Sequence, residues 1–177
     1  MPDAINAALF IIRIGVGVIF LAHGIKHARG RVKTSNWFAS IGFKKADLQW
    51  LASTATEIGV GVLLIVGLLT GFAAAGVIGI MFVAYWTVHR SAGFFITSFM
   101  KEGVEVEGYE YVAVLGMLGL ALAVSGPGEF SIDHAIELSG VSLAEYFDGR
   151  AGGLLAIGAI GVSALQLATF WRPSNVD

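Results

Sequence analysis

The sequence contains no cysteine, and this absence removes several kinds of chemistry from consideration. Without cysteine the chain has no disulfide framework, no thiolate-ligated iron–sulfur cluster and no thiol nucleophile. Charge is scarce as well: Asp, Glu, Lys and Arg make up 14 % of the residues, whereas a soluble domain carries about a quarter. The net charge of −2 gives no reason to expect a nucleic-acid partner. The dinucleotide-binding glycine motif, the phosphate loop, HExxH and GxSxG do not occur either.

Apolar residues take the place of the missing charge. Hydrophobic residues form 56 % of the 177 positions, with 24 glycines, and the mean hydropathy is +0.77. They gather in five long stretches, which are residues 6–25, 50–69, 72–88, 109–124 and 151–171. A helix of about 20 apolar residues crosses the hydrocarbon core of a bilayer. We therefore predict an all-α, multi-pass integral membrane helical bundle in the inner or plasma membrane of the cell.

The segments between these stretches constrain how the helices connect. Only Thr70 and Gly71 separate the second stretch from the third, so the two must form an antiparallel hairpin. Small residues at 73–76 allow close approach of the helix backbones, which is how membrane helices pack. Pro127, between two glycines, ends the fourth stretch. Aromatic residues among polar ones at 35–43 predict a short helix at the membrane interface.

Lysine and arginine are distributed unevenly among the loops. One side of the predicted topology carries most of them: Lys26, Arg29, Arg31, Lys33, Lys44, Lys45, Arg90, Lys101 and Arg172. The opposite side has only Arg150. Because basic loops stay in the cytoplasm, we predict an external N-terminus and a cytoplasmic C-terminus.

Two charged residues lie deep inside apolar stretches, Arg13 in the first and Glu57 in the second, whereas Glu110 is at the start of the fourth. A charge at the bilayer centre costs about 2.5–3.5 kcal/mol on insertion scales, so each should face protein or water and have a partner. We expect Arg13 and Glu57 to form a buried charge pair, since paired groups neutralise each other and share hydrogen bonds. Two alternatives stay open: Arg13 contacts an anion or ligand, or Glu57 is protonated and bonds a backbone carbonyl.

Four polar residues fall at the same predicted depth, near the cytoplasmic ends of the helices. They are His23, Lys26, His89 and Glu110. We predict that they converge in one ligand-binding pocket, which would bind a quinone head group, relay protons or hold a metal. Alternatively, each side chain bonds only its neighbours or water. Haem ligation by His23 and His89 is disfavoured by their positions at helix ends, and nothing in the sequence indicates haem or a metal; His27 and His134 are expected in solvent.

These residues resemble a known family. Arg13 followed by the sequence HGIK at 23–26 is similar to the first helix of DoxX proteins, and EIGVGVLLIVGLLT at 57–70 is similar to their second. Glu110 and the sequence GPGEFSID at 126–133 resemble their closing motif. The resemblance covers residues 6–135 and implies a four-helix membrane bundle. We accordingly divide the chain into a DoxX-like core, residues 1–135, and an addition, residues 136–177, which contains the fifth apolar helix.

The resemblance to DoxX also implies a function. It indicates a membrane-embedded subunit of a redox system, linked to quinone and to sulfur or thiol oxidation or oxidative stress, with quinone as its cofactor. Because the chain has no cysteine, thiol chemistry would have to come from a protein partner in a membrane complex. The competing hypothesis is a non-catalytic scaffold or lipid- or cargo-binding protein. The fifth helix would contact a partner or a second copy of the chain in a homo-oligomer.

Overall fold

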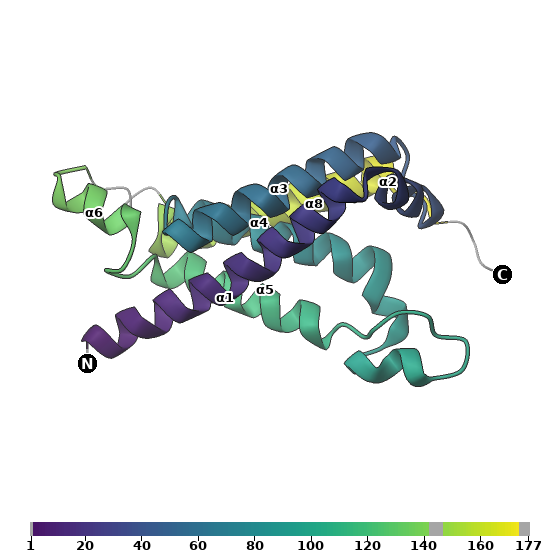
Figure 1. The fold of residues 1–177 in the computed structure, drawn as a ribbon, viewed down its shortest axis with the longest axis horizontal. Coiled ribbons are helices and arrows are strands. Elements are labelled where there is room, and N and C mark those ends of the chain that lie inside the picture. The colour runs from purple at the N-terminus through teal and green to yellow at the C-terminus, as the bar shows by residue number, and fades with distance from the viewer. Residues whose placement is uncertain (1, 142–146, 174–177) are drawn as a thin grey trace.

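The protein is described from a computed structural model that covers residues 2–141 and 147–173. It is an all-α membrane bundle, which confirms the predicted fold class (Figure 1). Its α-helices are α1 (Pro2–Arg29), α2 (Arg31–Ser40), α3 (Ala46–Val66), α4 (Thr70–Ala84), α5 (Glu110–Ser125), α6 (Ile132–Leu138) and α8 (Gly149–Phe170). After α4 the chain continues through the π-helical turn η1 (Tyr85–His89) and the 3-10 turns η2 (Arg90–Ala92) and η3 (Ile96–Met100).

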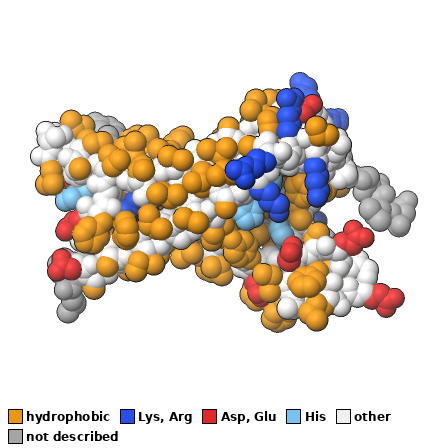
Figure 2. Space-filling model, in the orientation of Figure 1, with side chains coloured by type: hydrophobic (Ala, Val, Ile, Leu, Met, Phe, Trp, Pro, Cys, Tyr) orange, Lys and Arg blue, Asp and Glu red, His pale blue; other side chains and the backbone are white. Residues whose placement is uncertain are grey.

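Helix length and composition match a bilayer. Among the described residues, four helices are long and apolar enough to cross a membrane: Asp3–Arg29, Ala46–Val66, Thr70–Ala92 and Gly149–Phe170. The remaining apolar helix, α5, has 16 residues and is shorter. Figure 2 shows hydrophobic side chains along the middle of the molecule and most charged side chains toward its two ends. This distribution is the one expected of a bundle whose long axis crosses a bilayer.

The core lies where α1, α3, α4 and α5 meet. It is built from the buried residues Val16, Phe20, Val60, Leu64, Ala73, Ala74, Val77, Leu115, Leu122 and Ala123. Glycine makes the closest helix contact possible: a Cβ at Gly61 in α3 would lie 2.6 Å from the backbone nitrogen of Leu21 in α1. The alanines predicted to allow close packing, Ala73 and Ala74, are indeed buried in this core. Small residues thus let the backbones approach without a hydrophobic driving force from water.

The added helix α8 packs against α4 and α5. The Ser163 hydroxyl of α8 donates a hydrogen bond to Gly79 O of α4, with a distance of 3.2 Å. At the start of α8, a Cβ on Gly152 would overlap the carbonyl oxygen of Ala123 at the end of α5. The fifth helix is therefore packed into the bundle, while the division at residue 135 stays a prediction.

The end of α8 is tied to the loop between α2 and α3. Phe43 and Trp171 form an isolated antiparallel bridge, the Lys44 amide donates to Phe170 O at 2.7 Å and the Arg172 amide donates to Gly42 O at 2.8 Å. This contact places the end of α8 beside α2, at the end of the molecule opposite the N-terminus (Figure 1). The predicted assignment of that end to the cytoplasm stays a prediction.

Candidate functional site

Arg13 is fully buried between α1, α3 and the loop that follows α5. Its Nη1 donates to Leu64 O at 2.9 Å, its Nε donates to Pro127 O at 3.1 Å, and its Nη2 donates to Phe130 O. All three acceptors are backbone carbonyls near the ends of helices, where the helix itself provides no donor. The guanidinium therefore satisfies carbonyls that would otherwise be unpaired in an apolar environment.

Among the described residues Arg13 and Glu57 have other partners than each other, so their direct pairing stays a prediction. Side chains on a helix lean toward the N-terminus of their own helix. Since α1 and α3 are antiparallel, Arg13 leans toward one end of the bundle and Glu57 toward the other. Leu64, which Arg13 contacts, lies about 10 Å further along α3 than Glu57 at 1.5 Å per residue. The predicted pairing rested on the depth of each residue along its helix, which does not include this opposite lean of the side chains.

Glu57 instead pairs with His27, a residue expected in solvent. Glu57 Oε2 lies 2.8 Å from His27 Nδ1, and Glu57 Oε1 accepts a hydrogen bond from the Ser53 hydroxyl at 3.2 Å. The Glu57 side chain is 7 % exposed and that of His27 is 21 % exposed. The indole of Trp50 donates to the backbone carbonyl of His27 at 2.9 Å and so holds this end of α1 against α3. The sequence analysis missed His27 because a residue this close to a helix end is usually solvated.

A second polar group ties α6 to the turn between α3 and α4. The Asp133 carboxylate accepts hydrogen bonds from the amides of Leu69 and Thr70 at 2.7 and 2.9 Å. Its own amide donates to Gly67 O at 2.9 Å. The first amides of α4, like those of every helix, have no partners within the helix. Asp133 therefore acts as the cap of α4 from a distant part of the chain, and the sequence indicated it only as part of the family motif.

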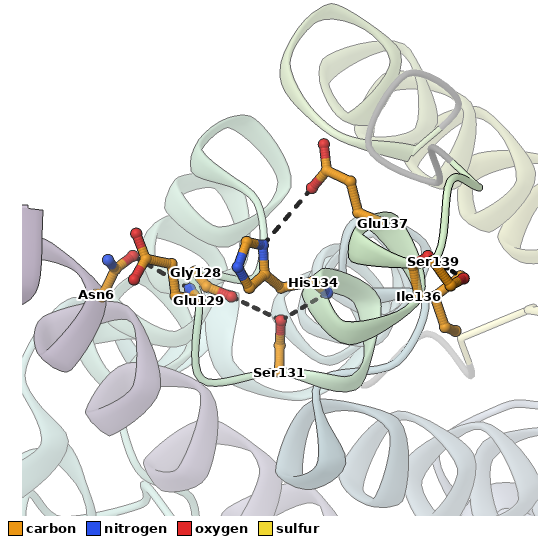
Figure 3. Close-up of polar contacts among 8 residues, drawn as sticks. All are labelled: Asn6, Gly128, Glu129, Ser131, His134, Ile136, Glu137 and Ser139. Atoms are coloured by element: carbon orange, nitrogen blue, oxygen red, sulfur yellow. Dashed lines mark hydrogen bonds and ion pairs between the residues drawn. The ribbon is translucent and has the colours of Figure 1, made fainter.

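Next to Asp133 lies a polar cavity of about 310 Å³. Figure 3 shows part of its wall: the Asn6 side chain accepts from the Glu129 amide at 3.2 Å, and His134 Nδ1 lies 3.7 Å from Glu137 Oε2. Asp148, which precedes α8, also lines this cavity. Burial raises the pKa of Asp148 to about 6, and the negative charges of Asp133 and Glu137 add to the effect. Within the described residues, no group of three or more histidine or acidic side chains is placed to hold a metal ion.

In the described part of the chain, the structure does not bring the four predicted ligand residues into polar contact with one another. His23 Nδ1 lies 3.0 Å from Ile19 O in its own helix, and His89 Nδ1 lies 2.8 Å from Glu107 O. The Glu110 amide donates to Phe94 O at 2.9 Å, and Lys26 is exposed. Within residues 2–141 and 147–173, no hydrogen bond or ion pair joins any two of these four side chains. Their role as ligand residues stays a prediction.

A second and larger cavity lies between α4, α5 and α8. Its volume is about 1120 Å³. The residues that line it are Ile78, Met81, Phe82, Tyr85, Trp86, Tyr109, Val112, Ala113, Gly116, Leu120, Arg150, Gly153, Leu154, Ala156, Ile157 and Ile160. Tyr85, Trp86 and Tyr109, where α4 ends and α5 begins, form one end. Among the described lining residues Arg150 alone is charged, and it lies at the other end, at the start of α8. The sequence analysis missed this cavity because its walls are ordinary apolar helix faces.

The fold and its apolar surface define an α-helical, multi-pass membrane protein. Residues 8–90 match the family model described as DoxX, which confirms the resemblance over the first half of the chain. A Haemophilus influenzae protein described as "Uncharacterized protein" is 26 % identical over 140 residues, which is 75 % of this chain and 85 % of that protein. No solved structure matches the chain.

Proposed function

We propose that the protein is a membrane-embedded subunit of a quinone-linked redox system, as its DoxX region implies, and that the cavity between α4, α5 and α8 holds the quinone. The cavity is the observation that carries this proposal. Pockets for drug-sized ligands measure about 300–1,000 Å³ and are mainly apolar. A cavity of about 1120 Å³ with apolar walls suits a ring with an isoprenoid tail.

The aromatic end of the cavity is where the head group would lie. Tyr85 and Tyr109 are in edge-to-face contact there, with ring centroids 5.3 Å apart. The phenol groups of tyrosine can donate hydrogen bonds to a quinone oxygen, and their rings can pack against the quinone ring. The predicted ligand residues His89 and Glu110 are close in sequence to Trp86 and Tyr109. From these positions His89 and Glu110 could pass a proton to a quinone head group at the aromatic end of the cavity.

A second candidate is a lipid- or cargo-binding protein without redox activity. The observation that favours it is Arg150, the single charged side chain among the described residues of this apolar cavity wall. A guanidinium at one end of an apolar cavity would suit the phosphate of an anionic phospholipid whose acyl chains lie along α8.

The two candidates are separated by titrating the purified protein with a short-tail quinone and, separately, with an anionic phospholipid. The readout is fluorescence of Trp86, the tryptophan in the cavity wall, with Trp86→Phe as the background. We expect the quinone to quench Trp86. Gly116→Leu should weaken this binding because its side chain fills the cavity, where the nearest atom to a Cβ is Met81 Cβ at 3.9 Å.

The matched control is Gly161→Leu, because Gly161 is also a helical glycine but has open space around it and does not line the cavity. It should bind the quinone like the wild type. Binding of phospholipid alone, weakened by Arg150→Gln, would favour the lipid-binding candidate. Equal quinone binding by wild type and Gly116→Leu would rule out this cavity as the quinone site.

A further inference from the structure

We propose that residues 93–100 form a hydrophobic cap that lies in the hydrocarbon layer of the bilayer and completes the short transmembrane helix α5. This inference concerns the connection between α4 and α5, which appears in the sequence as a polar loop. It does not depend on the proposed function.

The cap exposes large apolar side chains that have no protein partner to cover them in the described chain. Phe95 is 62 % exposed and Met100 is 76 % exposed. Phe94, Ile96 and Phe99 are exposed as well. Residues 93–100 include no charged side chain, and the acidic residues follow them, at Glu102, Glu105 and Glu107. A contiguous apolar patch of this kind marks contact with a membrane or a partner.

The length of α5 shows why lipid is the occupant. Its 16 residues extend about 24 Å at 1.5 Å per residue. The hydrocarbon core is about 30 Å thick, so α5 alone leaves part of the layer uncrossed. The candidate spans that pack around it have 21 to 27 residues. Apolar residues placed at the start of α5 would supply the missing length.

The backbone at the start of α5 is satisfied in the way that lipid requires. The amides of Gly108, Tyr109 and Glu110 donate to the carbonyls of Phe95, Gly93 and Phe94, at 3.1, 2.9 and 2.9 Å. The first amides of a helix have no partner within the helix and usually bond water or a capping side chain. Here the cap provides backbone acceptors instead. An unpaired backbone group in contact with hydrocarbon costs several kcal/mol, so these bonds remove an obstacle to placing the start of α5 next to lipid.

The cap is held in place by its own contacts. Ser98 is 1 % exposed, and its hydroxyl donates to Phe95 O at 2.7 Å. The Phe94 ring packs edge-to-face on Tyr109, with centroids 5.5 Å apart. A Cβ at Gly108 would overlap Phe95 O, so glycine is needed where the cap meets α5. Figure 2 shows acidic side chains at the far tip of this lobe and others on its inner side, around its hydrophobic side chains. Those at the tip are expected if the tip reaches water.

The absence of cysteine makes the test direct, since a single introduced cysteine can be labelled without background. Nitroxide labels are attached at Phe99→Cys and Met100→Cys in the full chain, reconstituted in phosphatidylcholine nanodiscs. Val162→Cys, on the exposed face of α8, is the lipid reference, and Glu105→Cys is the water reference. The measurement is the collision of each label with oxygen, which concentrates in lipid, and with a water-soluble nickel chelate.

We expect the labels at 99 and 100 to behave like that at 162, with high oxygen collision and loss of nickel collision relative to 105. Met100→Cys tests the proposal even if Phe99→Cys disturbs the fold, because Met100 is the more exposed of the two. Nickel collision at position 100 equal to that at 105 would overturn the proposal. In that case the patch faces water in the isolated protein, as a docking surface for a partner protein would.

Discussion

Arg13 holds three segments of the chain together through three hydrogen bonds, one from each of its side-chain nitrogens. Its carbonyl partners belong to Leu64, Pro127 and Phe130, so the loop after α5 is fastened to α1 and α3 by one side chain. The planar guanidinium of an arginine in this position donates hydrogen bonds, in a fixed geometry, to backbone carbonyls. The negative charge of Asp133 offsets its positive charge without direct contact.

Replacing Arg13 should therefore destabilise the protein strongly, and lysine should not rescue it. Each buried acceptor left unpaired costs about 1–3 kcal/mol, and an ammonium group cannot reach all three carbonyls. Thermal unfolding in detergent should show a large drop in Tm for both Arg13→Leu and Arg13→Lys. Adding Glu57→Leu to Arg13→Leu should lower the Tm further; recovery of the Tm in the double variant would instead support the predicted direct pair.

Asp148 makes stability depend on pH in an unusual direction. Its pKa rises from 3.8 to about 6 on folding, so the folded protein keeps the proton at pH values where the unfolded chain has lost it. The contribution of Asp148 to stability is therefore greatest below pH 3.8, falls as pH rises toward 6, and stays lower above it. Asp148→Asn should remove this decline and raise the Tm at neutral pH.

The control for Asp148→Asn is Glu105→Gln, which removes one exposed carboxylate in the loop before α5. It should leave the pH dependence of the Tm unchanged. If Asp148→Asn and wild type lose stability in parallel between pH 3.8 and about 6, the carboxylate is not buried as described.

At the scale of elements, the end of α8 and the loop before α3 depend on each other. The contact needs Gly42, whose φ of +98° is positive and where a Cβ would lie 2.4 Å from Arg172 O. We expect Gly42→Ala to separate the two segments and lower the Tm. Gly140→Ala is the matched control, because Gly140 has a similar φ of +95° but nothing within 4 Å of the added Cβ.

Comparing these two variants by thermal unfolding separates the lost contact from backbone strain. Both substitutions place alanine in a left-handed conformation, so both carry a strain cost. Only Gly42→Ala also displaces the end of α8. A Tm equal in the two variants would mean that the contact between the α2–α3 loop and α8 contributes nothing to stability.

The elements could be predicted from sequence far better than the contacts between polar residues. Length and apolar character locate α1, α3, α4 and α8, because a bilayer imposes both. The Arg13–Glu57 pair could not be judged in this way, since it depends on where each side chain leans and on carbonyls in the distant 126–130 loop. The cap at 93–100 was also missed, because its charged neighbours make the segment appear polar. The His27–Glu57 contact depends on the crossing of α1 and α3, which the residue pattern does not give.

At the scale of the whole molecule, the bundle has two chemically different ends. The end with α2 carries most of the lysine and arginine side chains in view (Figure 2), and the opposite end carries the polar cavity near Asp133. With the positive end in the cytoplasm, a reporter fused after residue 177 should be cytoplasmic and one inserted at Ser139 external. The reverse pattern would mean the opposite orientation in the membrane, with the aromatic end of the large cavity on the external side.

The central claim, that the cavity between α4, α5 and α8 holds a quinone, is tested most directly by the molecules that stay bound. The protein is extracted with its surrounding lipid by a polymer, without detergent, and bound quinone is quantified by mass spectrometry against total lipid. Wild type and Gly161→Leu should retain quinone above the level in the membrane, and Gly116→Leu should lose it. If the ratio of quinone to total lipid in all three proteins equals that in the membrane, so that only phospholipid is enriched, the claim is contradicted.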